Sequence, residues 1–105
     1  MAWLALFVAG VFEVVWAISM KQSVGFTRPL ASTITIVTMF VSFGLLAYAM
    51  RSLPLGTAYT IWTGIGAVGA FVAGIAWLGE PVTFMRVAAA VLIVSGLVLM
   101  KAATP

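Results

Sequence analysis

The feature that most constrains this chain is a set of four apolar runs separated by short polar segments. Each run holds roughly 20 residues, the length that an α-helix needs to cross a hydrocarbon core about 30 Å thick. We expect helices at about residues 2–20, 30–50, 56–78 and 81–100. Gly, Pro and charged residues in "KQSVGFTRP", "RSLPLG" and "GEP" predict tight connections between them. The sequence therefore predicts an all-α integral membrane protein, in which residues 1–105 form a single domain, a four-transmembrane-helix bundle with short loops.

The first and last runs each allow a second interpretation. Residues 1–20 have the length of a cleaved signal peptide, but no basic segment precedes the apolar run and Glu13 lies within it. In the fourth run Pro81 suits the first turn of a helix, whereas Arg86 leaves a charge-free stretch that is short for a complete crossing. We expect the Arg86 side chain to extend to the lipid headgroups, which preserves the fourth span.

Composition excludes several classes of function. Hydrophobic residues make up 65% of the chain and charged residues 7%, which is unlike a soluble domain and makes the lipid bilayer the expected solvent. Cys and His are absent, so disulfides and the usual zinc sites are excluded, and no metal or cofactor is expected. The five Lys and Arg residues are scattered singly, which gives no basis for binding nucleic acid. With so few acid, base or nucleophile candidates, we expect no enzyme.

The charges in the loops give almost no instruction about orientation in the membrane. Four spans put Arg51 and Lys101 on one side of the membrane and Lys21, Arg28 and Arg86 on the other. Because positive residues normally mark the cytoplasmic side, two against three is a weak bias. One hypothesis is that the chain inserts in both orientations and that opposite copies pair as an antiparallel homodimer. The alternative is a weak bias that lipid or a partner resolves.

Glu13 is the only acidic residue expected at membrane depth. It lies about 16 Å from the start of the first span, near the centre of the hydrocarbon core. A charge there costs about 3 kcal/mol on insertion scales, and no span has a basic residue in its interior to pair with it. The counter-charge must come from outside the chain, as a proton or a cationic ligand, and mutually exclusive binding of the two is the minimum that an exchanger needs. The alternative is a permanently protonated side chain bonded to a hydroxyl or an indole.

Helical spacing indicates which side chains surround Glu13. Gly10 and Trp16 lie on its face, three residues before and after it, and the Trp16 indole offers an N–H donor and an aromatic wall for a cation. The candidates on other spans are Ser42, Tyr59, Trp62, Thr63 and Gly66. Structural interpretations stay open, since Trp16 can serve packing alone and Ser42 can bond its own helix backbone.

Small residues mark two further features. Gly64 and Gly66, in the middle of the third span, suit either close helix packing or a flexing point that exposes a site to each face in turn. A stripe on the fourth span carries no chemistry and suits a helix-to-helix contact in a dimer. It comprises Ala89, Ile93, Gly96, Leu97 and Met100.

These motifs together resemble the small multidrug resistance transporters, and within them the guanidinium exporter subtype. The resemblance covers the whole chain, with a central glutamate in the first helix followed by "GFTRP", "LPLGTAYTIWTGIG" and "GEPVT" in this order. It implies an antiparallel, dual-topology homodimer in which Glu13 is the shared proton and substrate site. The residues it implies around Glu13 are Trp16, Ser42, Tyr59 and Trp62.

Two positions bear on the substrate. Trp16 resembles the guanidinium subtype, because the drug-exporting subtype characteristically has glycine at this position. Thr60 departs from the pattern, in which a small apolar residue, commonly alanine, is expected. A pocket altered beside Tyr59 would extend the range of substrates toward alkylated guanidiniums or quaternary ammonium compounds.

The resulting prediction is a proton-coupled antiporter that exports guanidinium or small guanidinyl cations and is a multi-pass protein of the bacterial inner membrane. Three alternatives stay open at this stage. A quaternary ammonium multidrug exporter of the same family shares every feature except Trp16. A proton-binding rotor subunit also has a lone membrane carboxylate, but it usually has two helices. A non-transporting assembly subunit would pair Glu13 with a base on a partner protein.

Overall fold

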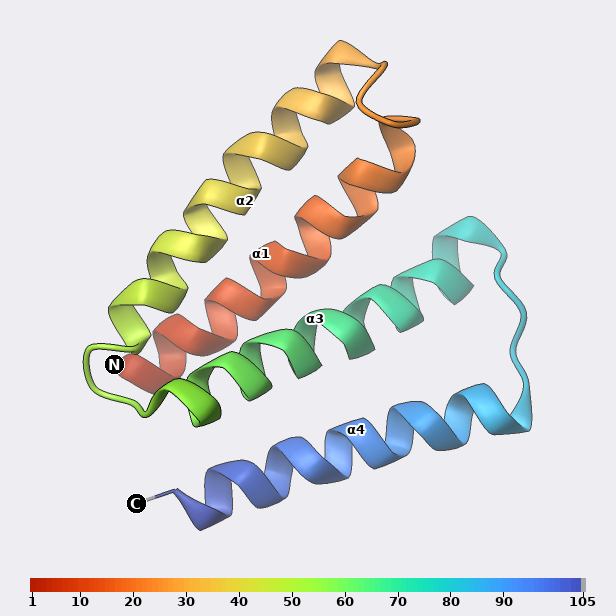
Figure 1. The fold of residues 1–105 in the computed structure, drawn as a ribbon. Coiled ribbons are helices and arrows are strands. Elements are labelled where there is room, and N and C mark those ends of the chain that lie inside the picture. Colours follow the sequence, from red (N-terminus) through yellow and green to blue (C-terminus); the bar gives the residue numbers. More distant parts are fainter. Residues whose placement is uncertain (105) are drawn as a thin grey trace.

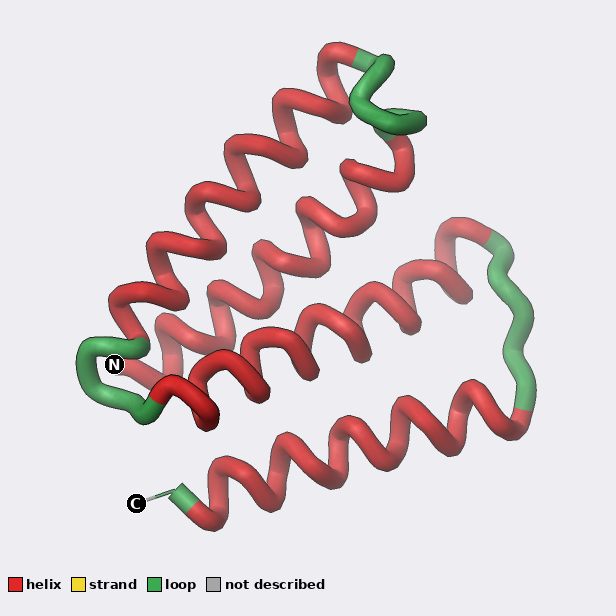
Figure 2. The backbone as a smooth tube through the Cα atoms, in the orientation of Figure 1, coloured by secondary structure: helices red, strands yellow, loops and turns green. Residues whose placement is uncertain are grey.

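The computed structural model describes residues 1–104 and consists of four α-helices joined by short connections (Figure 1). The helices are α1 (Ala2–Gln22), α2 (Pro29–Ala49), α3 (Leu55–Leu78) and α4 (Phe84–Ala103). Each is long and apolar enough to cross a membrane, which confirms the predicted all-helical fold with four spans. The chain between them is short throughout, as the backbone trace shows (Figure 2).

α4 differs most from the prediction, because both of its ends lie three residues further along the chain than expected. The helix begins at Phe84 and not at Pro81, because Thr83 caps it by accepting a hydrogen bond from the Arg86 backbone N–H at 3.2 Å. Pro81 instead lies in the extended connection that leaves α3. That connection starts at Gly79, whose φ of 68° is in the left-handed region that favours glycine and ends α3.

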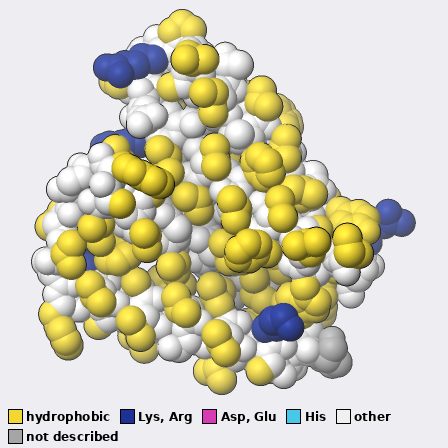
Figure 3. Space-filling model, turned by 180° about the vertical axis from the view of Figure 1, so that it is seen from behind, with side chains coloured by type: hydrophobic (Ala, Val, Ile, Leu, Met, Phe, Trp, Pro, Cys, Tyr) yellow, Lys and Arg dark blue, Asp and Glu magenta, His cyan; other side chains and the backbone are white. Residues whose placement is uncertain are grey.

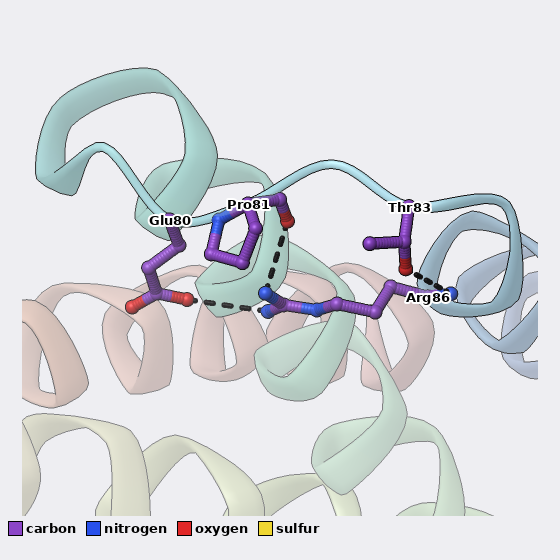
Figure 4. Close-up of polar contacts among 4 residues, drawn as sticks. All are labelled: Glu80, Pro81, Thr83 and Arg86. Atoms are coloured by element: carbon purple, nitrogen blue, oxygen red, sulfur yellow. Dashed lines mark hydrogen bonds and ion pairs between the residues drawn. The ribbon is translucent and has the colours of Figure 1, made fainter.

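The Arg86 side chain extends back over the connection between α3 and α4 (Figure 4). Its Nη2 lies 3.3 Å from Glu80 Oε1, and its Nη1 donates a hydrogen bond to the Pro81 carbonyl oxygen at 3.0 Å. The guanidinium carbon also lies 5.3 Å from the centre of the Phe71 ring. Arg86 thus lies in the first turn of α4, at the N-terminal end of the helix. It does not place a charge deep in the fourth span.

The helices form a flat array. α1 lies between α2 and α3, while α4 packs against α3 alone in its backbone contacts (Figure 1). The molecule measures 43 × 34 × 16 Å, and the smallest extent is little more than the diameter of one helix, which is about 10–12 Å with side chains. Within one chain, packing against neighbouring helices therefore buries only part of the surface of each helix.

The buried core lies where the start of α1, the end of α2 and the start of α3 converge. Its members are Leu6, Ala9, Leu46, Ala49, Leu53, Ala58, Ile61 and Trp62. α4 has no buried residue. Hydrophobic side chains spread over the face seen in Figure 3, and Lys and Arg stand there as separate groups. Lipid or a second chain must cover a surface of this kind.

Candidate functional site

Glu13 lies in the middle of α1 with its carboxyl group packed directly against α3. A Cβ atom built at Gly66 would overlap Oε1, Cδ and Cγ of Glu13. Gly66 is buried and Glu13 is half-buried. The absence of a side chain at Gly66 therefore lets the acid lie on the backbone of the neighbouring helix.

Two polar atoms on this face of α1 are buried without a partner. Glu13 Oε1 and Trp16 Nε1 have no hydrogen-bond partner within residues 1–104. One is an acceptor when the acid is ionised and the other is a donor, and they belong to residues one helical turn apart. An unsatisfied buried group costs about 1–3 kcal/mol, and native proteins contain few of them. The pair makes this face a candidate binding site, and the alternative of a bond from Glu13 Oε1 to a hydroxyl or an indole is not found here.

Other charges are remote from this face. The ion pair found among the described residues joins Glu80 to Arg86 at the start of α4, so Glu13 has no ionic partner there. In the same part of the chain, no group of three or more His, Cys, Asp or Glu residues could hold a metal ion. The negative charge of an ionised Glu13 is therefore uncompensated within residues 1–104.

A chain of hydrogen bonds joins α1, α2 and α3 at Ala9, about one helical turn before Glu13 on α1. The Ser42 hydroxyl donates to the Ala9 carbonyl oxygen at 2.7 Å and accepts a hydrogen bond from Trp62 Nε1 at 2.9 Å. Ser42 and Trp62 are both buried. Ser42 therefore bonds across helices rather than to its own backbone, and in this structure its hydroxyl is not bonded to Glu13.

A series of aromatic rings connects Trp16 with α3. The ring centres of Trp16 and Phe43 are 6.4 Å apart, and their planes are inclined by 74°. Phe43 lies 5.7 Å from Trp62, which in turn lies 5.5 Å from Tyr59. Phe43 is the member that sequence reasoning missed. It follows Ser42 directly, but an apolar residue in a membrane span carries no signal that separates it from its lipid-facing neighbours.

The other predicted residues of α3 face α4 rather than Glu13. Tyr59, Thr60, Thr63 and Gly64 line a groove of about 550 Å³ between α3 and α4, and Glu13 is not part of it. The Thr63 hydroxyl donates to the Tyr59 carbonyl oxygen of its own helix at 2.7 Å. Within one chain the predicted site is thus divided in two, and the contact between the Tyr59 and Trp62 rings connects the two parts.

Small residues mediate close helix contacts near both parts. A Cβ atom at Gly10 would lie 2.6 Å from Ile65 Cγ2, so Ile65 of α3 fills the space beside Gly10. Gly64 is covered by Leu97 of α4 in the same way. Leu97, which we expected at a dimer contact, therefore also packs within the chain. Of the other members of that stripe, Ala89, Ile93 and Gly96 are exposed, whereas Met100 is half-buried and packs against the core.

Comparisons with known proteins agree with these observations. A family model described as Small Multidrug Resistance protein matches residues 1–93. The chain is 53% identical over 104 residues to the guanidinium exporter of Escherichia coli (strain K12), with 99% of both chains covered. It is 52% identical, with the same coverage, to the guanidinium exporters of Citrobacter freundii and Salmonella typhimurium. The predicted resemblance, the class of transporter rather than enzyme, and the multi-pass location in a bacterial inner membrane are confirmed. The chain belongs to the Small Multidrug Resistance protein family.

Proposed function

We propose that this chain is a proton-coupled antiporter that exports guanidinium or small guanidinyl cations, with Glu13 as the shared site for proton and substrate. The observation that carries the proposal is the pair of buried, unpartnered polar atoms on α1, Glu13 Oε1 and Trp16 Nε1. Similarity to guanidinium exporters over 99% of the chain supports the class of substrate.

Guanidinium has the shape and charge that this position favours. It is a planar cation whose N–H groups pair with a carboxylate through two parallel hydrogen bonds, as an arginine head group does. The rings of Trp16, Phe43 and Trp62 lie in series, Trp16 is one helical turn from the acid, and aromatic faces attract cations. The indole N–H of Trp16 supplies a further donor for the carboxylate. A cation without N–H groups would form no hydrogen bond to the oxygens of Glu13.

A single carboxylate couples the two fluxes because it binds a proton or a cation but not both. Substrate binds ionised Glu13, and a proton takes its place after release. Either ligand neutralises the acid, whereas an empty, ionised site costs about 3 kcal/mol or more to move through lipid. This cost restricts the alternating step to loaded states, so that export of the cation is exchanged for uptake of protons.

The unit of function in this proposal is an antiparallel homodimer of a single-domain chain, residues 1–105, with one Glu13 from each copy facing a shared cleft. The nearly even distribution of basic residues, two against three, supports insertion in both orientations. α4 supports pairing, because it has no buried residue and packs against α3 alone. The exposed small residues of its stripe, Ala89 and Gly96, permit a close approach of a second helix.

Electrical current on a solid-supported membrane tests the proposal. Purified protein in liposomes receives a jump in guanidinium concentration, and Glu13→Gln removes the ionisable group with little change in size. Glu80→Gln is the matched control, because it makes the same change at an ion pair outside the site. We expect E13Q to abolish the current and E80Q to retain it. A wild-type current from E13Q would refute the role of Glu13.

A quaternary ammonium exporter of the same family is the second candidate. The groove of about 550 Å³ beside Tyr59 and Thr60 favours it, since most of its lining is apolar and suits alkyl groups. A jump in tetraalkylammonium concentration in the same assay separates the two functions. Current for the ammonium with silence for guanidinium would favour this candidate, and silence for both would favour the assembly subunit.

A further inference from the structure

A second groove, of about 500 Å³, lies where α1, α3 and α4 meet. Its size falls within the range of small-molecule sites. Apolar side chains such as Phe7, Ile65 and Val98 line it, with Lys101 as the one charged residue in the lining. Glu13 and the aromatic series around it are not part of this groove, so the proposed exchange leaves it without a role.

Lys101 gives the groove a positive end. Its Nζ lies 4.7 Å from the centre of the Trp3 ring. The ion pair found within residues 1–104 joins Glu80 to Arg86, so no acid there neutralises Lys101. An ammonium group has three N–H donors, and contact with one ring face leaves donors for an anion. The same positive charge repels guanidinium and ammonium ions, which makes this groove unsuitable for the transported cation.

Trp3 and Lys101 lie at helix ends, where the lipid headgroups are expected. Trp3 is in the first turn of α1 and Lys101 is in the last turn of α4, and the contact between them brings these ends together. Trp and Lys at such positions are typical of the membrane interface. From Trp3 to Phe7 the groove extends about 6 Å along α1 into the hydrocarbon region. It therefore combines a charged end at headgroup depth with apolar walls at acyl-chain depth.

We propose that this groove binds one acidic phospholipid, with the phosphate on Lys101 and an acyl chain along Trp3, Phe7 and Val98. The positive end matches an anionic headgroup, and the apolar walls match the hydrocarbon chain that hangs from it. α4 packs against α3 alone in its backbone contacts. A lipid in this position connects α4 to α1, two helices that have no backbone contact with each other, and so stabilises the position of α4.

Native mass spectrometry of the purified full chain, titrated with phosphatidylglycerol, tests this site. Phosphatidylcholine is the zwitterionic reference. Lys101→Gln removes the charge and Lys101→Arg keeps it. Arg51→Gln is the matched control, because Arg51 is an exposed cation expected at the same membrane face and does not line the groove. We expect K101Q to weaken phosphatidylglycerol binding about fivefold, which corresponds to about 1 kcal/mol, while K101R and R51Q keep wild-type affinity.

The rise in unfolding temperature on adding lipid provides a second readout. A purely structural role of Lys101 would change the unfolding temperature without lipid but not this rise. Phosphatidylglycerol should raise the unfolding temperature of the wild type and of K101R more than that of K101Q. Equal loss of binding in K101Q and R51Q would indicate general surface attraction and overturn the proposal. Equal affinity of the wild type for both lipids would do the same. If K101Q left lipid binding intact but weakened the dimer, the groove would belong to a second copy of the chain and the lipid site would be wrong.

Discussion

The Ser42 hydroxyl joins three helices about one helical turn from Glu13, and its removal is the sharpest test of how the site is built. Ser42 is fully buried in α2, and its oxygen bridges the Ala9 carbonyl of α1 and the Trp62 indole of α3. Ser42→Ala removes that oxygen and breaks both hydrogen bonds. Because alanine is no larger than serine, the substitution tests the two hydrogen bonds with little change in packing.

The expected magnitude follows from what the substitution leaves behind. Trp62 Nε1 would stay buried without an acceptor, which costs about 1–3 kcal/mol. The Ala9 carbonyl loses less, because it lies within α1 and keeps its place in the helical hydrogen-bond ladder. The Trp62 ring also contacts Phe43 and Tyr59, so its rotation toward a new acceptor would move the aromatic wall. If the full cost falls on the substrate-bound state, the apparent affinity for guanidinium falls by about 5- to 150-fold.

Two measurements check this prediction, the free energy of unfolding in detergent and the guanidinium concentration that gives half-maximal current. Thr35→Val is the matched control, since Thr35 is also fully buried in α2 but its hydroxyl donates to Ala31 of its own helix, at 2.8 Å. We expect the control to change either quantity little, because a bond to the preceding turn adds little to helix stability. If Ser42→Ala and Thr35→Val had equal effects, the bridge between the helices would not hold the site.

Three further substitutions test separate contacts. Gly66→Ala puts a Cβ atom where the Glu13 carboxyl group lies, so we expect loss of guanidinium current; Gly44→Ala, whose Cβ would meet nothing within 4 Å, should retain the current. Thr60→Ala restores the residue type of the family pattern, and we expect the ratio of guanidinium to tetraalkylammonium current to rise; an unchanged ratio would contradict a role for this position in selectivity. Glu80→Gln breaks an ion pair between partly exposed side chains while Arg86 keeps its contacts with Pro81 and Phe71, so the free energy of unfolding should fall by no more than about 1 kcal/mol, and by less in high salt; a larger loss would show that the pair matters more than exposed pairs do.

The spans could be predicted from the sequence because the thickness of the hydrocarbon core sets their length. The residue at which a helix begins depends on local hydrogen bonds, and at α4 the cap formed by Thr83 outweighs the preference of Pro81 for a first turn. The lateral order of the helices could not be predicted, since apolar faces in lipid differ little from one another. Contacts such as Gly10 against Ile65 decide it, and these require the three-dimensional structure.

The residues of the candidate site also fall into those that the sequence predicts and those that only the structure identifies. Glu13 could be identified because a lone acid at membrane depth is costly, and Trp16 follows from helical spacing. Phe43 could not, because only its contacts with Trp16 and Trp62 distinguish it from a lipid-facing residue. Ser42 was a candidate as a deep hydroxyl, but its role in bridging α1 and α3 depends on the packing of three helices.

The nearly even distribution of basic residues leads to a prediction about how the copies of the chain are oriented in the membrane and whether transport requires two opposite copies. Gln22→Arg with Val82→Arg adds two positive residues to the side that already has more, which changes the distribution from two against three to two against five. The three changes Ser52→Arg, Ala103→Arg and Lys21→Gln invert the bias to four against two. Apart from Lys21, whose removal is intended, the altered positions carry no charge in the native chain. Both variants should insert in a single orientation, because positive residues near the spans set topology.

If opposite copies form the working unit, each variant expressed alone lacks its partner. We expect no guanidinium transport from either variant alone and restored transport when both are expressed together, with orientation measured by the accessibility of introduced cysteines. A variant that is held in one orientation and transports at the wild-type rate would show that one chain, or a parallel pair, suffices. The exposed stripe of α4 would then face lipid, and each chain would need its own complete site around Glu13.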